Sequence, residues 1–155
     1  MSLTIRPPTI ADAAIIAEFN ARLAWETEDK KLDPPTALRG VHAQLADPAK
    51  GWYLLACAGD DVVGQLAVTF EWSDWKCGWF WWIQSVYVRA DSRGRGVFRA
   101  LYQDVVSRAK AAGDVTAIRL YVEQDNHKGQ STYRALGMEK TSYEVFEQVI
   151  LRNQE

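Results

Sequence analysis

The sequence has few of the features that mark exported, membrane-spanning or nucleic-acid-binding proteins. Its two cysteines, Cys57 and Cys77, do not have the spacing of a metal or redox motif. No apolar run reaches the roughly 18 residues that a membrane span needs, and the first residues, MSLTIRPP, lack the apolar stretch of a signal peptide. The net charge of −2 provides no overall positive field for nucleic acid. We therefore expect a cytoplasmic protein that binds neither nucleic acid nor membrane.

The sequence also lacks a group of histidine, cysteine and acidic residues at metal-ligand spacing, so we expect no metal. With 155 residues, 48% of them apolar, the chain can bury one core, which predicts a single domain over residues 1–155. Tryptophan is abundant, with seven residues, and five of the seven lie between positions 72 and 82. This cluster can serve as packing in the core, as a homodimer contact or as one wall of a ligand pocket.

Hydrophobic periodicity predicts a short first strand, Leu3 to Arg6, and a helix that ends near Ala24. A polar, irregular segment over residues 25–33 then precedes a second helix, which begins with Asp33-Pro34 and ends near Asp47. Three strands follow, over residues 52–58, 62–72 and 79–88, and their short connections predict an antiparallel meander.

The second half of the chain begins with a long helix from Gly96 to about Ala112. A strand around Ile118 to Val122 is predicted to run parallel to residues 79–88, because a helix connects the two. A short helix, residues 128–136, and one or two strands within residues 141–151 complete the chain. The predicted fold class is α+β, with a mixed, mostly antiparallel central sheet flanked by helices, in the order β-α-α-β-β-β-α-β-α-β(β).

The most informative stretch is IQSVYVRADSRGRGVFRAL, residues 83–101. It is typical of a strand, an arginine- and glycine-rich turn, and a helix that begins at the second glycine. Strict alternation places Ile83 and Tyr87 on one face of the strand, and Val86 and Val88 on the other. Backbone N–H groups at a helix start have no intrahelical partners, and glycine lets a ligand approach them. The turn is therefore a candidate cradle for a diphosphate, supported by arginines at 93, 95 and 99.

Two segments carry a family resemblance. Val86-Tyr87-Val88 followed by Arg93-Gly94-Arg95-Gly96-Val97 resembles the acyl-coenzyme A binding motif of the GNAT N-acetyltransferase superfamily, R/Q-x-x-G-x-G/A. Phe98 occupies the last position of the motif, where Gly or Ala is usual. Asn126 and the run STYRALGM, residues 131–138, resemble the family's N…YxxLGF segment, and the order of elements agrees as well.

The resemblance implies an acetyl-CoA site. The backbone of Val86 and Val88 would pair with the pantetheine arm, amides around Arg93 to Arg99 would hold the pyrophosphate, and Asn126 would bind the arm. Tyr133 would lie near the sulfur and give a proton to the departing thiolate, although a packing role is the alternative for this tyrosine. The implied cofactor-binding residues are Val86, Tyr87, Val88, Arg93, Gly94, Arg95, Gly96, Val97, Phe98, Arg99, Asn126, Ser131 and Tyr133.

The general base is not evident in the sequence. Several members of the family place a glutamate on the strand before the turn, where this chain has Gln84 and Ser85. The candidates are Glu28 and Glu26 in the polar segment, with Gln84 orienting a water or the acceptor. Glu71 on the neighbouring strand is a further candidate, and each carboxylate can equally be a solvated surface group.

The implied activity is transfer of an acetyl group from acetyl-CoA to a primary amine. The acidic WETEDKK segment favours a small cationic acceptor, and the tryptophan cluster could form one wall of its pocket. A peptide N-terminus or a protein lysine remains an alternative acceptor. A second interpretation is a module with this fold that binds coenzyme A as a sensor and transfers nothing.

Overall fold

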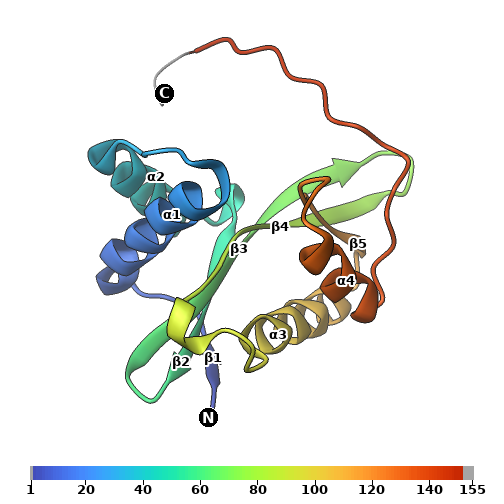
Figure 1. The fold of residues 1–155 in the computed structure, drawn as a ribbon. Coiled ribbons are helices and arrows are strands. Elements are labelled where there is room, and N and C mark those ends of the chain that lie inside the picture. Colours follow the sequence, from blue (N-terminus) through green and yellow to red (C-terminus); the bar gives the residue numbers. More distant parts are fainter. Residues whose placement is uncertain (1, 152–155) are drawn as a thin grey trace. The chain divides into compact units, whose positions relative to one another are not determined.

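The computed structural model describes residues 2–151, which form two compact units, one ending at Leu120 and the other beginning at Tyr121. The first unit contains a five-stranded sheet in the order β1-β2-β3-β4-β5 (Figure 1). Its strands are β1 (Thr4–Arg6), β2 (Trp52–Ala58), β3 (Asp61–Ser73), β4 (Gly78–Val88) and β5 (Val115–Leu120). The first four are antiparallel neighbours, and β5 is parallel to β4. The predicted α+β class, the meander and the parallel last strand are confirmed. A single domain over residues 1–155 stays a prediction.

Three helices belong to this unit: α1 (Ala13–Glu28), α2 (Pro34–Ala46) and α3 (Val97–Ala112). Helix α2 begins as predicted, because the Asp33 carboxylate accepts a hydrogen bond from the Thr36 N–H at 3.2 Å. Helix α3 lies between two glycines in the left-handed region, Gly96 with φ 78° and Gly113 with φ 82°. Short 3₁₀ turns occur at η1 (Ile10–Asp12), η2 (Pro48–Lys50) and η3 (Ala90–Ser92).

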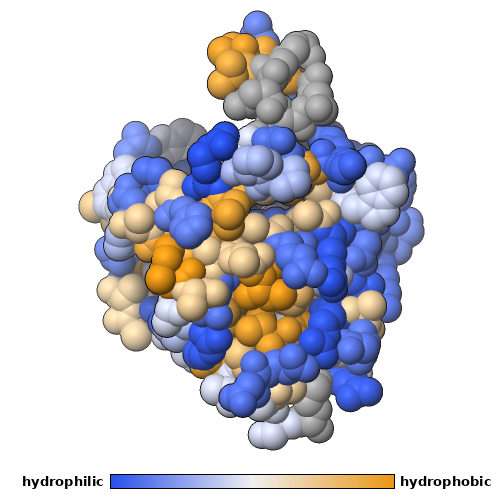
Figure 2. Space-filling view, turned by 90° about the vertical axis from the view of Figure 1, so that its left-hand side faces the viewer, coloured by the Kyte–Doolittle hydropathy of each residue, from blue (hydrophilic) through white to orange (hydrophobic). Residues whose placement is uncertain are grey.

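The sheet carries an apolar cluster on each face. On one face, Leu54, Leu66 and Ile83 pack with the buried side of α3. On the other face, Leu55 packs with Ile16 of α1, Val41 of α2 and the side chains around them. Apolar residues also reach the surface, which Figure 2 shows as orange patches between hydrophilic side chains. A sheet covered by helices on both faces explains why β2 has no charged residues.

Strand β4 contains a bulge that the sequence did not reveal. Gln84 pairs with Ala67 and Tyr87 pairs with Gln65, so Ser85 and Val86 together lie opposite a single residue of β3. Ser85 has φ 52°, which is unusual for a residue with a side chain. The bulge corrects the predicted alternation, because the extra residue moves Tyr87 to the α1 face, where its ring centre is 5.0 Å from that of Phe19. Val86 and Val88 pack instead against the α3-side cluster that contains Ile83.

The second unit contains one helix, α4 (His127–Ala135), close to its predicted position. Asn126 caps it, since its side-chain oxygen accepts a hydrogen bond from the Gly129 N–H at 2.9 Å. The predicted final strand or strands within residues 141–151 are wrong for the described chain, because this segment has no regular secondary structure. Its alternating apolar residues meet the requirement for a strand face, but a strand forms only where its backbone finds a ladder partner.

Candidate functional site

Strand β4 has an edge that β5 covers only in part. The parallel ladder begins with Trp79 opposite Val115 and ends with Ile83 opposite Leu120, the last residue of β5. Strand β4 continues for five more residues, to Val88. The ladder with β5 therefore does not extend over Gln84 to Val88, and an extended ligand arm can pair with this backbone as an added strand.

The turn that follows β4 leads into the start of α3. Gly94 and Gly96 have φ 75° and 78°, and a Cβ atom added at either position would meet no heavy atom within 4 Å. The backbone is therefore open to a ligand on the side where a side chain would stand. The Ala100 N–H is already bonded to the Gly96 carbonyl, so the amides that precede it are the ones available at the helix start. These features fit the predicted cradle for linked phosphates.

Two residues of the predicted motif contribute their side chains to the core. Val97 is 2% exposed, and Phe98 packs against the α3-side cluster with its ring centre 6.0 Å from that of Tyr102. Gly64 on β3 allows this close approach, because a Cβ there would lie 2.7 Å from the Val97 side chain. Any contact of Val97 and Phe98 with a phosphate would therefore be made by their main chain.

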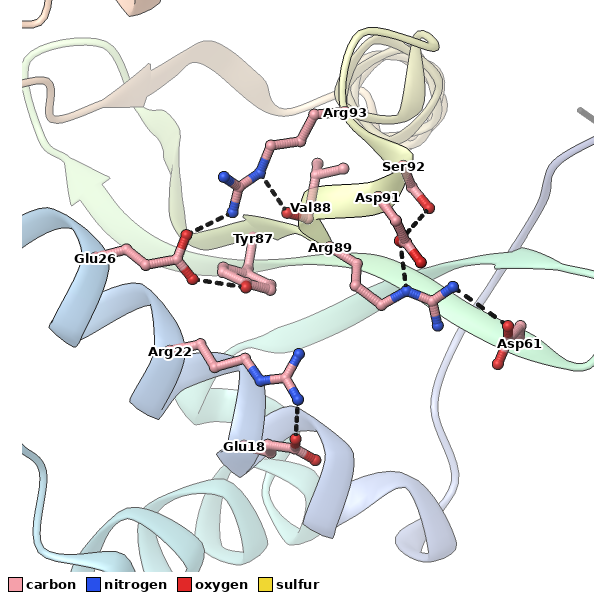
Figure 3. Close-up of polar contacts among 10 residues, drawn as sticks. All are labelled: Glu18, Arg22, Glu26, Asp61, Tyr87, Val88, Arg89, Asp91, Ser92 and Arg93. Carbon is pink, nitrogen blue, oxygen red and sulfur yellow. Dashed lines mark hydrogen bonds and ion pairs between the residues drawn. The ribbon is translucent and has the colours of Figure 1, made fainter.

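Glu26, Tyr87 and Arg93 form a polar network beside the turn (Figure 3). The Arg93 guanidinium donates to one oxygen of Glu26 at 2.7 Å, and the Tyr87 hydroxyl donates to the other oxygen at 2.7 Å. Arg93 Nε also donates to the Val88 carbonyl at 2.9 Å. The bond from Arg93, and then that from Tyr87, lowers the pKa of Glu26 below its ordinary value. Burial, and then the bond to Glu26, raises the pKa of Tyr87.

A second polar group holds the other side of the turn (Figure 3). Arg89 donates to Asp91 at 2.7 Å and to Asp61 at 3.3 Å. The Arg89 N–H donates to the Val63 carbonyl at 2.8 Å, and the Ser92 hydroxyl donates to Asp91. These contacts tie η3 to the β2–β3 hairpin, so the turn leaves β4 in a defined direction.

The structure places two of the candidate bases on another element than the sequence predicted. Helix α1 extends to Glu28, four residues beyond the predicted end, so Glu26 and Glu28 lie on its last turn and not in an irregular segment. The structure brings Glu26 to the turn, whereas Glu28 pairs with Lys30 at 3.6 Å. Gln84 donates to the Thr69 hydroxyl on β3 at 2.6 Å. Glu71 accepts a bond from the Trp82 indole N–H at 2.8 Å.

Arg95 and Arg99 are exposed at the turn and on the first turn of α3, and three further candidates lie in the second unit. The side-chain oxygen of Asn126 is used in capping α4, and Ser131 is exposed on that helix. Tyr133 is half-buried on the same helix, and burial raises the pKa of its hydroxyl. A phenol with a raised pKa keeps its proton at neutral pH, as a proton donor must.

The tryptophan cluster is partly packed and partly exposed. Trp52 and Trp81 meet edge to face with ring centres 5.3 Å apart, and Trp72 and Trp79 do so at 5.0 Å. Trp75 is 90% exposed. A shallow cavity of about 460 Å³ is lined by Ala49, Phe70, Trp79, Trp81 and Asp114. The aromatic side chains therefore both fill the sheet surface and leave an open apolar hollow.

Sequence reasoning missed Gln65. This side chain is fully buried in β3, and its amide nitrogen donates to the Asn20 oxygen of α1 at 2.8 Å and to the Ser85 carbonyl of β4 at 3.1 Å. The signal was a single glutamine within the apolar run VVGQLAV. A polar side chain at a two-sided buried position requires hydrogen-bond partners, and here one of them is the bulge.

Over residues 2–151 no group of three metal-binding side chains comes together. The helices of the same described range are all too short or too polar to cross a bilayer. The open strand edge and the glycine turn form a site suited to an elongated ligand that carries phosphate at one end.

Comparison with known proteins identifies the family of the chain. The chain belongs to the acetyltransferase (GNAT) family, whose model matches residues 16–138, so the resemblance found in the sequence is confirmed. The chain is 29% identical over 143 residues to an L-methionine sulfoximine/L-methionine sulfone acetyltransferase of Pseudomonas aeruginosa, covering 90% of this chain and 81% of that protein. It is 28% identical over 138 residues to a mycothiol acetyltransferase of Mycolicibacterium vanbaalenii. That match covers 86% of this chain but only 44% of the relative's length.

Solved structures share the fold. A possible acetyltransferase from Clostridium difficile 630 superposes with a TM-score of 0.90 at 38% identity, covering 98% of this chain and all of that one. A predicted acetyltransferase from Clostridium acetobutylicum, solved with acetyl-CoA, superposes with a TM-score of 0.79 at 19% identity, covering 95% and 96% of the two chains. At that identity the second similarity concerns the fold alone.

Proposed function

We propose that this chain is an N-acetyltransferase that moves an acetyl group from acetyl-CoA to a primary amine of a small molecule. The observation that carries the proposal is the juxtaposition of an uncovered strand edge, Gln84 to Val88, with a glycine turn open to a ligand at the start of α3. Membership of the acetyltransferase family supports the reaction type. The acyl donor supplies an activated thioester, and no metal is proposed to take part.

The chain's own residues would hold the donor by main-chain contacts. The backbone of Val86 and Val88 flanks Tyr87 on the open edge and would pair with the pantetheine arm. The amides from Arg93 to Arg99 would hold the pyrophosphate, with Arg95 and Arg99 as cationic support. Asn126 and Ser131 on the second unit would bind the arm, and Tyr133 would stand near the sulfur.

In the reaction, the amine nitrogen forms a bond to the carbonyl carbon and the carbon–sulfur bond breaks. The amine proton must pass to a base, and the departing thiolate takes a proton, which we assign to Tyr133. The lowered pKa of Glu26 and the hydrogen bonds to both of its oxygens disfavour it as the base. We therefore assign the base to Glu28, acting directly or through a water that Gln84 orients.

The acceptor class is proposed from two observations. Both relatives named above are called after small molecules, mycothiol and methionine sulfoximine or sulfone. In this chain, Glu26 and Glu28 lie on the last turn of α1, and the contact with Arg93 brings Glu26 to the cofactor turn. The carboxylates on this last helical turn favour a cationic amine by charge complementarity.

A panel of amines tests the function. Purified protein is incubated with acetyl-CoA and, separately, a polyamine, amino acids, methionine sulfone, an aminoglycoside and a lysine peptide, and thiol release is recorded. We expect turnover with a small amine and none with the peptide. Calorimetry with coenzyme A runs in parallel. If coenzyme A stabilises the fold but no amine is acetylated, the chain is a binding module; if coenzyme A does not bind at millimolar concentration, the site assignment fails.

We further propose that the protein is a cytoplasmic homodimer. Both cysteines are free, which fits a reducing compartment. The segment from Tyr143 to Leu151 exposes six large apolar side chains, among them Phe146 at 91% and Ile150 at 88%, and such a concentration of exposed apolar side chains makes this segment a candidate contact. Light scattering should give twice the chain mass for the wild type and for Thr141→Asp, but the chain mass for Phe146→Asp. A wild-type monomer would contradict the dimer.

A further inference from the structure

The buried amide of Gln65 has a fixed orientation. Its nitrogen lies between two oxygens, the Asn20 side-chain oxygen at 2.8 Å and the Ser85 carbonyl at 3.1 Å. A carbonyl oxygen cannot donate, so the group that faces Ser85 must be the NH₂ of Gln65. The other atom of the amide, Oε1, is buried and has no partner among the described residues. An unsatisfied buried acceptor costs free energy, so its presence here indicates that the two bonds made by the nitrogen have a role.

The bond from Gln65 fixes the peptide that joins Ser85 to Val86. No peptide in the described chain is cis, so the C=O of Ser85 and the N–H of Val86 point in opposite directions from one plane. Gln65 holds the C=O on its own side. The Val86 N–H is therefore turned away from Gln65.

The alternation of the β3–β4 ladder shows where the Val86 N–H points. The Arg89 N–H donates to the Val63 carbonyl of β3. Backbone N–H and C=O groups alternate in direction along a strand, so those of Tyr87, two residues before Arg89, also point towards β3. The backbone N–H and C=O of Val88 point away from β3, and this carbonyl accepts the bond from Arg93. Val86 lies two residues before Val88, so its backbone N–H points the same way, towards the edge that β5 does not cover.

We propose that Gln65 is a positioning residue for acetyl transfer. Its buried carboxamide, anchored to α1 through Asn20, holds the Ser85–Val86 peptide so that the Val86 N–H donates to the oxygen of the acyl thioester. When the amine nitrogen bonds to the carbonyl carbon, negative charge develops on that oxygen, and it disappears as the carbon–sulfur bond breaks. A donor aimed before the reaction stabilises this charge without reorganising. The inference rests on the proposed function and names the residue that sets the geometry of its carbonyl site.

The test compares Gln65→Leu with Gln44→Leu. Gln44 is a matched control, because it too has one buried side-chain atom without a partner among the described residues, in this case its amide nitrogen, but it lies on α2 away from the bulge. Loss of one aimed donor costs roughly 100- to 1,000-fold in kcat, so a donor that is only misaligned should cost roughly 10- to 100-fold. The dissociation constant of coenzyme A, which has no acyl oxygen, should stay within about threefold of the wild type. Gln44→Leu should retain kcat.

A conservative variant separates positioning from support of the fold. In Gln65→Glu the introduced carboxyl can donate to Ser85 only when protonated, so kcat relative to wild type should rise as the pH falls, while the relative dissociation constant of coenzyme A stays flat. Asn20→Ala removes the anchor and serves if Gln65→Leu does not fold; it should lower kcat and spare coenzyme A binding.

Unchanged kcat in folded Gln65→Leu, or in Asn20→Ala when Gln65→Leu does not fold, overturns the inference. The inference is also overturned if Gln65→Leu loses kcat and coenzyme A affinity in parallel while the kcat of Gln65→Glu does not recover at low pH. Failure of the wild type to bind coenzyme A or to acetylate any amine would instead refute the proposed function.

Discussion

Arg93 and Glu26 form an ion pair between the turn after β4 and the last turn of α1, with 2.7 Å between Nη2 and Oε1. The same guanidinium bonds the Val88 carbonyl and lies 5.5 Å above the centre of the Tyr87 ring. The arginine that opens the predicted acyl-coenzyme A motif is thus oriented by one carboxylate, one carbonyl and one aromatic face. This arrangement assigns Glu26 a role in holding the turn, which differs from the role of a base.

The assignment predicts different outcomes for two neighbouring glutamates. Glu26→Gln should lower kcat/KM less than about threefold, because its pKa is depressed and its oxygens are engaged. Glu28→Gln should lower kcat/KM by roughly 100-fold or more, as loss of a general base does. Because the Arg93–Glu26 pair is half-exposed, its loss should cost at most about 1 kcal/mol of stability.

Steady-state kinetics from pH 5 to 9 decide between the two glutamates. A loss of roughly 100-fold or more in Glu26→Gln, with Glu28→Gln close to the wild type, would make Glu26 the base after all. Profiles that match the wild type for both variants would exclude both carboxylates.

The glycine turn gives a second prediction, for Gly96→Ala. Its φ of 78° is strained for any residue with a Cβ, which costs about 1 kcal/mol, and the methyl group would enter the open space of the predicted phosphate cradle. We expect coenzyme A affinity to fall by roughly tenfold or more, since the phosphates could no longer approach the amides.

Gly113→Ala is the control for that experiment. Gly113 has nearly the same φ, 82°, and equally open surroundings, but it ends α3 at the opposite terminus from the turn. Thermal unfolding should show similar losses of stability for both variants, and calorimetry should show weaker coenzyme A binding for Gly96→Ala alone. Equal affinities in the two variants would remove the turn from the site.

Much of this framework could be predicted from the sequence because it depends on local patterns. The strand, turn and helix of residues 83–101 were visible as a change from strand to helical periodicity around two glycines. The β4 bulge was not visible, because Ser85 adopts φ 52° without being glycine, and no local signal distinguishes it from a regular strand residue.

Contacts between distant residues were also beyond the sequence. Glu26 meets Arg93 across 67 positions, and Gln65 meets Asn20 across 45. The end of α1 was missed because residues 26–28 are polar and Trp25 is exposed, so the hydrophobic periodicity ends before the helix does. The strand predicted within residues 141–151 failed for the opposite reason: the pattern is present, but the described chain forms no ladder there.

The start of α1 gives a third prediction, on stability and pH. The Asp12 carboxylate accepts two bonds from Arg6, at 2.9 and 3.0 Å, and one from the Thr9 N–H at 2.7 Å. The bond from Arg6 is the main cause that lowers the pKa of Asp12 below 3.8. A depressed pKa means that the stabilisation is present above pH 3.8 and is lost as the pH falls through the folded-state value.

Asp12→Asn should therefore be less stable than the wild type by about 1 kcal/mol at pH 7. The difference should shrink as the pH falls below 3.8 and through the lower folded-state pKa, where the wild-type carboxylate becomes protonated in the folded protein as well. Asp47→Asn is the matched control, because Asp47 also caps a short helix and pairs with Lys50 at 2.9 Å, but in an exposed position. Urea unfolding at several pH values measures both. A pH-independent gap for Asp12→Asn would show that the carboxylate does not account for it.

Tyr133 carries the last prediction, because a proton donor to the thiolate must remain protonated until the carbon–sulfur bond breaks. Burial raises the pKa of its hydroxyl, so the proton is present throughout the neutral range. Tyr133→Phe should lower kcat by roughly 100-fold, as loss of a general acid does, without weakening coenzyme A binding. Tyr143→Phe, an exposed tyrosine of the same unit, should behave as the wild type. If kcat in folded Tyr133→Phe stays close to the wild-type value, the tyrosine is a packing residue and the thiolate takes its proton from solvent.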